Sequence, residues 1–455
     1  MLDRRVALRL EAIRRLMRKG AVANLRRIVE KTHPADLAAI FGELNDLEQG
    51  RLFQILSSCG LAGEVMSHLE ANTLQQLMAS LSDDEMAGIL SAMESDDAAD
   101  LLSLLPEERQ GGVLAAMTHE DSQDIGSLLR YPEDSAGGIM TPSFFALGQA
   151  VSVHDAIDAI QGAEAAETVF YVYVVDDEER LVGVVSLRQL ITSAPSTSLR
   201  QVMNSDVISV AAAEDQEQVA RLVAKYDLLA IPVVETEGRL VGIITVDDVI
   251  DVLREEATED VYKMVGTSQE ELLYGNQVLP IARLRLPWLV VNLFGGVLTG
   301  TILWYFRATV EEIIALLSFL PVITGMGGNV GTQSSSILVR AFATGRVEFA
   351  DLPSHLWKEM RVGLLLGVVC GVLVGAAAFV WHRNPALGVV VGVSMTAAMT
   401  VAATMGTLAP AFFRRLDIDP AVASGPFVST ANDITGILIY LGTASMLLRF
   451  LPHVQ

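Results

Sequence analysis

Hydrophobic residues change their spacing along the chain, and these changes divide it into regions. Up to about residue 130 they recur every three or four positions, the period of amphipathic helices. Three segments there, beginning at Ser82, Ser95 and Pro106, repeat a unit of a cap residue or proline, acidic residues and apolar positions. Because short helical repeats stack into superhelical arrays, we predict an all-α N-terminal domain over residues 1–131.

After the segment GGIMTP, which begins at Gly137, the pattern becomes one of strands alternating with helices. The stretch YVYVVDDEERLVGVVSLRQLI from Tyr171 is echoed by IPVVETEGRLVGIITVDDVI from Ile231. Each copy predicts a strand, a turn, a strand and a helix, and each is preceded by a helical segment, at residues 153–161 and 215–225. We therefore predict an α/β tandem repeat over residues 132–252, with copies at about 137–195 and 196–252.

The last part of the chain is dominated by apolar runs long enough to cross a membrane as helices. We predict an all-α transmembrane domain over residues 283–455, with five spans at about 284–306, 313–339, 362–381, 388–413 and 421–448. If the chain starts in the cytosol, most basic residues lie at the cytosolic ends of the predicted spans, as the positive-inside rule requires. With five spans, this orientation places the C-terminus outside the cell. The inner ends hold Arg283, Arg285, Arg340, Arg346, Lys358, Arg361, Arg414 and Arg415, and the outer ends hold Arg307, Arg383 and Arg449.

Charge is distributed unevenly between these regions. From Arg283 onwards the chain holds eleven basic and eight acidic residues, so the residues before it carry a net charge of −26. A region this acidic repels itself unless cations screen it, so we expect divalent cations as partners and exclude nucleic acid. The two cysteines, Cys59 and Cys370, lie in different regions and allow neither a disulfide framework nor a CxxC metal site. The start of the chain has no apolar signal core, so we expect the soluble region in the cytosol.

Two helices of unusual charge flank the soluble region. Residues up to about Lys31 predict a basic amphipathic helix, which could touch anionic lipid or lie against the acidic domain that follows. We favour the second interpretation. A connecting helix over residues 253–282 precedes the membrane, and acids recur at helical spacing from the end of the second repeat into it, where they need counterions or face water. These acids are Asp248, Asp251, Glu255, Glu256, Glu259 and Asp260.

The last apolar run contains an aspartate, Asp433, near its middle. An ionised carboxylate at bilayer depth costs roughly 2.5–3.5 kcal/mol even on lenient scales, so such residues usually serve a function or have a partner. Hydroxyls and amides surround it at Ser429, Thr430, Asn432 and Thr435, and Pro426 should leave the carbonyl of Val422 without its helical partner. We favour a cation path over an aspartate paired with an arginine from another helix.

The second apolar run contains PVITGMGGNVGTQSSS, which begins at Pro321. Its glycines at 325, 327, 328 and 331 predict non-helical backbone lining a cavity, with Asn329, Thr332 and Gln333 as neighbours of Asp433. The alternative is a helix that packs closely through small residues. The segment lacks the GK[ST] ending of a nucleotide-binding loop.

This arrangement of an acidic helical-repeat domain, a tandem repeat, an acidic connecting helix and five spans resembles the MgtE family of bacterial magnesium channels. The motifs PVITGMGGNVGTQSS and DPAVASGPFVSTANDITG carry the resemblance most specifically. It implies a homodimer embedded in the lipid of the bacterial inner membrane, with a pore between the subunits that imports Mg²⁺ and closes when cytosolic Mg²⁺ binds. The acidic helix is what the family calls the plug.

The resemblance also assigns candidate sites. The pore would be lined by Asp433 as the selectivity carboxylate together with Gly325, Gly328, Asn329, Ser429 and Asn432. Regulatory Mg²⁺ would bind Asp96, Asp100, Asp215, Glu217, Asp227, Asp248, Asp251, Glu256, Glu259 and Asp260. The chemistry is consistent, because Mg²⁺ prefers octahedral oxygen ligands and keeps its waters, and two carboxylates on a two-fold axis could hold a hydrated ion.

The tandem repeat resembles a pair of CBS domains, a regulatory module that often binds adenine nucleotides. In that family a Ser or Thr followed three residues later by Asp meets the ribose. The second copy has Thr245 and Asp248, whereas the first has Ser186 and Gln189. The resemblance implies ATP as a cofactor, with Arg188, Thr245 and Asp248 as candidate contacts.

Competing functions are an enzyme, a membrane-anchored sensor and an ion-coupled transporter of divalent cations such as Mg²⁺, Co²⁺ and Mn²⁺. An intramembrane zinc protease needs HExxH, which none of the seven histidines begins, so we predict no enzyme. A pure CBS sensor would need neither Asp433 nor the glycine-rich segment. The sequence does not separate a channel from a coupled transporter.

Overall fold

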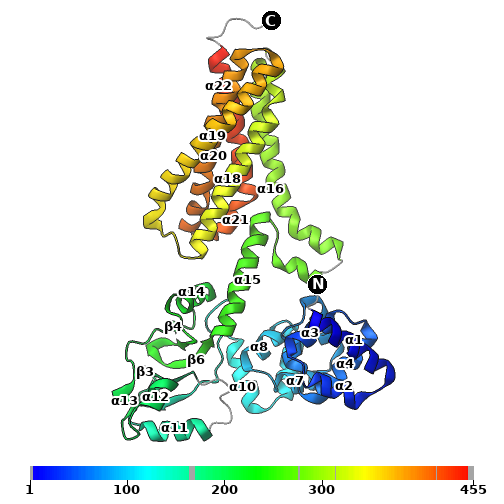
Figure 1. Ribbon diagram of the computed structural model, residues 1–455, viewed down its shortest axis with the longest axis vertical. Coiled ribbons are helices and arrows are strands. Elements are labelled where there is room, and N and C mark those ends of the chain that lie inside the picture. Colours follow the sequence, from blue (N-terminus) through cyan, green and yellow to red (C-terminus); the bar gives the residue numbers. More distant parts are fainter. Residues whose placement is uncertain (1–3, 163–169, 275–276, 313, 417, 449–455) are drawn as a thin grey trace. The chain divides into compact units, whose positions relative to one another are not determined.

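The computed structural model describes residues 4–162, 170–274, 277–312, 314–416 and 418–448 (Figure 1). It divides into two compact units, Met1–Arg254 and Glu255–Gln455. The first unit contains helices and two small sheets, and the second is helical throughout its described residues. The predicted fold class, with an all-α N-terminal region, an α/β repeat pair and an all-α region of apolar helices, is confirmed.

The first unit opens with a run of short helices, coloured blue to cyan in Figure 1. Buried aliphatic residues line one stripe of most of them, as the periodicity predicts. Capping boxes begin two of them, at Asn45 with Glu48 and at Ser82 with Glu85. The helices are α1 Arg4–Lys19, α2 Val22–Val29, α3 Pro34–Gly42, α4 Asp46–Cys59, α5 Ala62–Met66, α6 Ala71–Ser80, α7 Asp83–Leu90, α8 Ser95–Ser103, α9 Glu107–Ala116 and α10 His119–Leu128.

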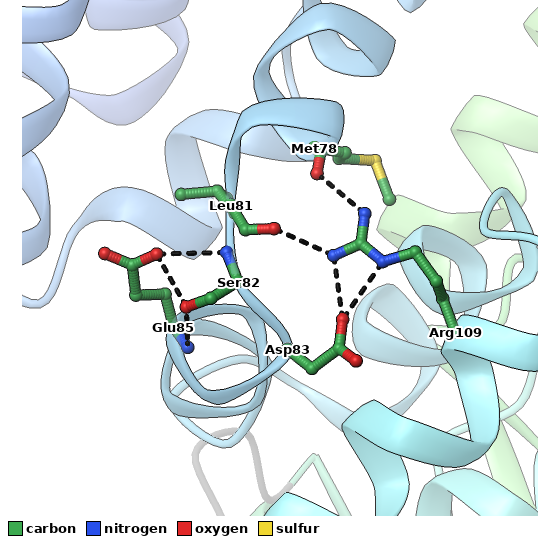
Figure 2. Close-up of polar contacts among 6 residues, drawn as sticks. All are labelled: Met78, Leu81, Ser82, Asp83, Glu85 and Arg109. Carbon is green, nitrogen blue, oxygen red and sulfur yellow. Dashed lines mark hydrogen bonds and ion pairs between the residues drawn. The ribbon is translucent and has the colours of Figure 1, made fainter.

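The repeat units pack on one another through the partly buried polar contacts of one arginine as well as through apolar contacts. Figure 2 shows Arg109 of α9 reaching back to α7, where its guanidinium donates to the Asp83 carboxylate at 2.9 and 3.0 Å. The same group donates to the carbonyls of Met78 and Leu81 at the C-terminal end of α6. One residue of the predicted unit is corrected: Ser95 is the first residue of α8, and Glu94 occupies the cap position.

The predicted tandem repeat forms two sheets with strand orders β1-β2-β3 and β4-β5-β6. In each, a short first strand pairs in parallel with the second, and the second pairs antiparallel with the third. The short first strands are additions that the sequence pattern did not predict. The elements are β1 Ala146–Gly148, α11 Val153–Gly162, β2 Tyr171–Val175, β3 Leu181–Ser186, α12 Leu187–Thr192 and α13 Leu199–Val202, then β4 Val210–Ala211, α14 Gln216–Tyr226, β5 Ala230–Val234, η1 Thr236–Gly238, β6 Leu240–Thr245 and α15 Val246–Val265.

The second repeat shares its core with the N-terminal helices. One continuous apolar cluster runs from Val6 of α1 to Val252 of α15. The first repeat packs around a cluster of its own and around a small cluster that it shares with Leu240 and Ile243 of β6. The first turns of α8 and of α15 therefore belong to the same packed body.

The second unit consists mainly of long helices. Its elements are η2 Gln269–Tyr274, α16 Val278–Tyr305, α17 Arg307–Glu312, η3 Ile314–Ser318, α18 Leu320–Ala343, η4 Phe349–Asp351, α19 Leu352–His382, α20 Pro385–Arg415, α21 Pro420–Ser424 and α22 Pro426–Leu448. Among the described residues, four stretches are long and apolar enough to cross a membrane, at 278–305, 314–343, 349–382 and 385–415. The fifth predicted span contains α22, whose crossing stays a prediction. Its outer end at Arg449, like the predicted start of the second span at Ile313, lies outside the described residues.

Three expectations about local backbone are corrected by the second unit. The acidic connecting helix ends at Val265 instead of continuing to residue 282, because η2 and the start of α16 occupy the rest. The glycine-rich segment is not a break, since α18 is one helix from Leu320 to Ala343. The run at 421–448 is divided at Gly425, and Pro426 begins α22, so it does not remove a bond from a helix interior.

Candidate cation pathway and acidic regulatory cluster

Asp433 lies on α22, half-buried in the second unit. Among the described residues of this single chain, no hydrogen bond or ion pair reaches its carboxylate. The interpretation of Asp433 as an aspartate neutralised by an arginine therefore has no support in these contacts. A carboxylate left in this position needs water, a mobile cation or a second chain as its partner.

The glycines of α18 play two different roles. Gly331 lies against α22 and α20, where a Cβ would overlap the amide of Asn432, and Gly406 of α20 packs on the Gly331 carbonyl. Here the packing alternative is the correct one. By contrast, Gly325 and Gly328 have open space at the Cβ position, and Gly325 and Asn329 are exposed on another face of the helix.

The exposed face of α18 carries polar side chains in its middle, between the exposed Val322 and Ile337. Asn329, Thr332 and Gln333 follow one another on it within about one turn, and all three are exposed in the single chain. A helix in an apolar run does not present such groups to lipid without a polar or aqueous counterpart. This face and the half-buried Asp433 both require something polar beside them.

The residues near Asp433 on α22 are held by contacts with other helices. Asn432 is 1% exposed, and neither of its amide atoms has a partner among the described residues. The hydroxyl of Thr430 donates to Asn292 of α16 at 3.0 Å, whereas Ser429 is partly buried. Packing of α22 on α16, α18 and α20 thus fixes the helix on which Asp433 sits.

A second buried acid in the helical unit was not predicted from the sequence. Glu359 of α19 is 5% exposed, and the hydroxyl of Ser334 on α18 donates to it at 2.9 Å. In the sequence, Glu359 lies between Lys358 and Arg361, which is typical of the exposed charged residues near the beginning of a helix. Only the packing of α19 shows that this carboxylate turns inward.

In the first unit, acidic residues from two different helices face one another. Asp96, in the first turn of α8, is 7% exposed, and one of its carboxylate oxygens has no hydrogen-bond partner among the described residues. Burial raises the pKa of Asp96 to about 8, and the charges of Asp248, Asp97 and Glu94 add to this rise. An unsatisfied buried carboxylate facing another acid suits a bound cation.

Asp248 lies across from Asp96, in the first turn of α15. Burial raises the pKa of Asp248 to about 6, although the hydroxyl and amide of Thr245 oppose the rise by donating to its carboxylate at 2.6 and 3.1 Å. Asp97 and Asp247 add further negative charge to the same cluster. We refer to Asp96, Asp97, Asp247, Asp248 and Asp251 as the α8–α15 acidic cluster.

The other predicted regulatory acids are more dispersed. Asp100 is exposed at a cavity of about 320 Å³, Asp215 caps α14, and Asp227 ends that helix in a left-handed conformation. Glu217 pairs with Arg221 at 2.7 Å, and Asp251 pairs with Arg254 at 3.3 Å. Glu256, Glu259 and Asp260 are partly buried on the second half of α15. Across the described residues, no group of three His, Cys, Asp or Glu side chains is placed to hold a metal ion.

The sequence analysis missed how α15 is attached to the helical unit. The ammonium of Lys263 lies 2.7 Å from Asp419 and 2.5 Å from Glu259. One residue further on, the carbonyl of Met264 packs on Gly425 so closely that a Cβ would overlap it. The end of the acidic helix therefore contacts the segment that leads directly into α22. No sequence signal pairs residues 156 positions apart.

The two copies of the proposed ribose motif have the same local structure. The backbone amide and hydroxyl of Thr245 donate to the Asp248 carboxylate at the start of α15, and Ser186 and Gln189 form a reciprocal capping box at the start of α12. Replacing the acid with Gln189 in the first copy thus keeps the helix start but removes its charge. Arg188 is exposed on α12.

We expect the acidic cluster to make the stability of the first unit depend on pH. The folded pKa of Asp96, about 8, exceeds the unfolded value of about 3.9, so the folded state holds an extra proton between these values. With cations chelated, lowering the pH from 8 to 6 should raise the free energy of unfolding by up to about 1.4 kcal/mol per pH unit. Thermal unfolding measured between pH 6 and pH 8 checks this prediction. In an Asp96→Asn variant, most of the pH dependence of the free energy of unfolding should disappear. The same pH dependence in Asp96→Asn and in the unsubstituted protein would contradict the raised pKa of Asp96.

Comparison with known proteins agrees with the architecture. The MgtE intracellular N domain model matches residues 32–134, CBS domain models match 136–195 and 199–255, and the MgtE divalent cation transporter model matches 320–443. Magnesium transporter MgtE of Thermus thermophilus is 39% identical, over 96% of this chain and 98% of its own. Its namesake from Bacillus subtilis is 35% identical, over 96% of both chains.

Solved structures resemble the soluble part. The soluble part of a magnesium transporter superposes with a TM-score of 0.51 at 32% identity, covering 55% of this chain and 99% of the other. The cytosolic domain of the Mg²⁺ channel MgtE in complex with ATP gives 0.50 at 37% identity, covering 53% and 99%. The full-length relatives are named as magnesium transporters. With identities of 35–39% over nearly the whole length, this chain belongs to the MgtE family of divalent cation transporters.

Proposed function

We propose that this protein carries Mg²⁺ across the bacterial inner membrane and that cytosolic Mg²⁺ closes the pathway. The observation that carries the proposal is Asp433, a carboxylate in the helical unit with no cationic partner among the described residues. Its chemistry suits a hard divalent cation that keeps most of its water shell. The named transport activity of the relatives supports Mg²⁺ as the ion.

The pathway is formed between two copies of the chain. A single Asp433 is a thin site for a dication, whereas two related by a two-fold axis can hold a hydrated ion through its waters. The polar face of α18, with Asn329 beside Gly325 and Gly328, then faces the pathway or the second copy instead of lipid. Ser429 lies one turn before Asp433 on the same helix and completes the lining, whereas the predicted lining residue Asn432 is buried against Gly331 of α18 and supports the helix from behind.

The soluble unit lies in the cytosol, and the C-terminus lies outside the cell. The excess of basic residues at the proposed inner ends of the spans supports this orientation. We place the N domain at 1–131, the CBS pair at 132–252, the plug segment at 253–282 and the transmembrane domain of five helices at 283–455. α22 is then the fifth span.

Closure depends on Mg²⁺ that neutralises acids meeting from different elements. Asp96 and Asp248 repel each other when both are ionised, and a bound Mg²⁺ would turn that repulsion into a bridge between α8 and α15. Asp100, Asp215, Glu217, Asp227, Asp251, Glu256, Glu259 and Asp260 would supply further weak sites, each with bridging waters. Mg²⁺ shifts the equilibrium toward the state that it binds more tightly, here the closed state. Many weak sites that each favour this state together make it the dominant one at high Mg²⁺.

The end of α15 transmits this state to α22. Lys263 joins Glu259 to Asp419, and the contact of Met264 with Gly425 leaves little room for α15 to move without moving the start of α22. The acidic plug segment and the helix that carries Asp433 therefore shift together.

Removing the Lys263 ammonium should weaken closure. In Lys263→Met, Glu259 and Asp419 face each other without a cation, and a partly exposed ion pair contributes about 1 kcal/mol or less. We expect the Mg²⁺ concentration for half-closure to rise by up to roughly fivefold. Mg²⁺-titrated currents check this, with Lys225→Met, which removes an exposed lysine elsewhere, as the matched control. An unchanged half-closure value would mean that this contact does not transmit closure.

ATP binds the CBS pair with contacts from Thr245, Asp248 and Arg188. The support is the similarity to a cytosolic domain solved with ATP, together with the Thr245–Asp248 pair at the start of α15. Because Asp248 also belongs to the α8–α15 acidic cluster, nucleotide and Mg²⁺ binding should influence each other.

The direct test is Mg²⁺ flux through the purified protein in liposomes. A channel should pass Mg²⁺ down its own gradient with no other ion gradient present. Flux that requires a proton or sodium gradient would instead establish the coupled transporter, and its selectivity among Mg²⁺, Co²⁺ and Mn²⁺ would follow from the same assay. Absence of flux under both conditions would leave only the CBS-containing sensor and would overturn the proposal.

A further inference from the structure

The outer face of α1 has no role in the function proposed so far. The predicted docking of this basic helix on the acidic domain is correct, because Val6, Leu10, Ile13 and Met17 are buried in the core. Arg9 pairs with Asp36 at 2.6 Å, and Arg14 lies 3.6 Å from Glu48. The opposite face of the helix is thus free of any role in folding the domain.

That opposite face carries a concentration of positive charge. Residues 1–31 hold ten basic and three acidic residues, whereas residues 32–282 hold 11 basic and 44 acidic residues. The face is defined by the exposed side chains Arg4, Arg5, Leu8, Arg15, Arg18 and Lys19, which we call the α1 basic face. Its one acid is Glu11. A local reversal of sign in so acidic a region indicates a partner that is itself negatively charged.

An exposed leucine lies in the middle of the α1 basic face. Leu8 is 62% exposed, and positions 4, 8, 15 and 19 share one side of the helix, so Leu8 is flanked by basic side chains. Val22, at the start of α2, is also 62% exposed. Bases that surround an exposed apolar side chain are typical of helices that lie in a membrane interface, where headgroups meet the acyl chains.

We infer that the α1 basic face binds the anionic phospholipid headgroups of the membrane in which the C-terminal unit resides. Charge complementarity alone would also admit nucleic acid or an acidic protein surface. The exposed Leu8 favours lipid, because neither a phosphate backbone nor a charged protein surface offers it an apolar environment. The chain itself also supplies a high local concentration of such headgroups, since the soluble unit is covalently tethered to membrane-spanning helices.

The test uses the full chain in lipid nanodiscs with a fluorescent probe at position 8. Cys59→Ser and Cys370→Ser remove the native thiols, and Leu8→Cys carries an environment-sensitive dye. Discs of phosphatidylcholine are compared with discs containing half phosphatidylglycerol, each with and without a lipid that carries a quencher in its acyl chain. We expect a blue shift and quenching in the anionic discs only. Raising salt from about 0.1 M to about 1 M should reverse both, since it shortens the Debye length from ~10 Å to ~3 Å.

Two charge variants complete the test. Replacing Arg4, Arg5, Arg15, Arg18 and Lys19 with Gln should abolish the shift. The matched replacement of five exposed bases outside this face should retain it, at Lys31, Arg51, Arg130, Arg200 and Lys225. If the basic-face variant fails to fold, the salt reversal in the unsubstituted background still decides. A probe that stays in water in anionic discs, or that is shielded equally in both disc types as by a second protein surface, would overturn the inference.

Discussion

Replacing Asp433 with alanine is expected to abolish Mg²⁺ flux while leaving the protein folded and assembled. The carboxylate has no partner among the described residues, so its removal breaks no contact within the chain and relieves the cost of a charge in an apolar helix. What disappears is the negative charge that replaces part of the ion's second hydration shell. Flux into liposomes should fall to the level of empty vesicles, a loss of at least about two orders of magnitude if the carboxylate supplies 3 kcal/mol or more.

Two further variants separate charge from size and position. Asp433→Asn keeps the size and removes the charge, so we expect loss of selectivity for divalent over monovalent cations. Thr435→Ala removes a hydroxyl that donates to the Ala431 and Asn432 carbonyls of its own helix, and this variant should retain flux. Normal Mg²⁺ flux through Asp433→Ala would remove this residue from the pathway.

Neutralising the acids of α15 is expected to abolish the response of the soluble unit to Mg²⁺. Asp248, Asp251, Glu256, Glu259 and Asp260 are changed together to Asn or Gln. The substitution removes both the repulsion at low Mg²⁺ and the bridges at high Mg²⁺, so the sign of its effect without Mg²⁺ is open, but the dependence on Mg²⁺ should vanish. Limited proteolysis at increasing Mg²⁺ measures this, and the unsubstituted protein should become protected at millimolar concentrations.

The control for this variant removes equal charge elsewhere in the soluble unit. Asp46, Glu107, Asp177, Asp206 and Glu214 are exposed acids outside the proposed sites, and their neutralisation should leave the protection curve near that of the unsubstituted protein. Coincident curves for both variants would show that total charge matters and that α15 is not the sensor.

Local sequence patterns predicted the elements whose structure depends on near neighbours. The helix cap at Ser82, the strands beginning near Tyr171 and Ile231, and the docking of α1 all follow from periodicity and cap residues within a few positions. Both copies of the CBS motif lie at helix starts, at Ser186 and Thr245. These features are fixed by local geometry, so one sequence is enough to find them.

The failures arose where packing between distant segments decides. The glycines of α18 were expected to break the helix, but the helix continues through them. Position 331 requires glycine because Asn432 and Gly406 pack directly on it. Pro426 was placed inside a helix because the apolar run continues through it, whereas the turn at Gly425 is shaped by its contact with Met264. The inward turn of Glu359 and the ion pair of Lys263 with Asp419 likewise join elements that no local pattern links.

Single-channel recording of the purified protein, with Mg²⁺ as the permeant cation and its concentration varied on the cytosolic side, tests the central claim most directly. The account predicts discrete Mg²⁺ currents that need no second ion gradient, that close as cytosolic Mg²⁺ rises to millimolar levels, and that are absent in Asp433→Ala. Currents that persist unchanged in Asp433→Ala, or that do not respond to cytosolic Mg²⁺, would contradict it.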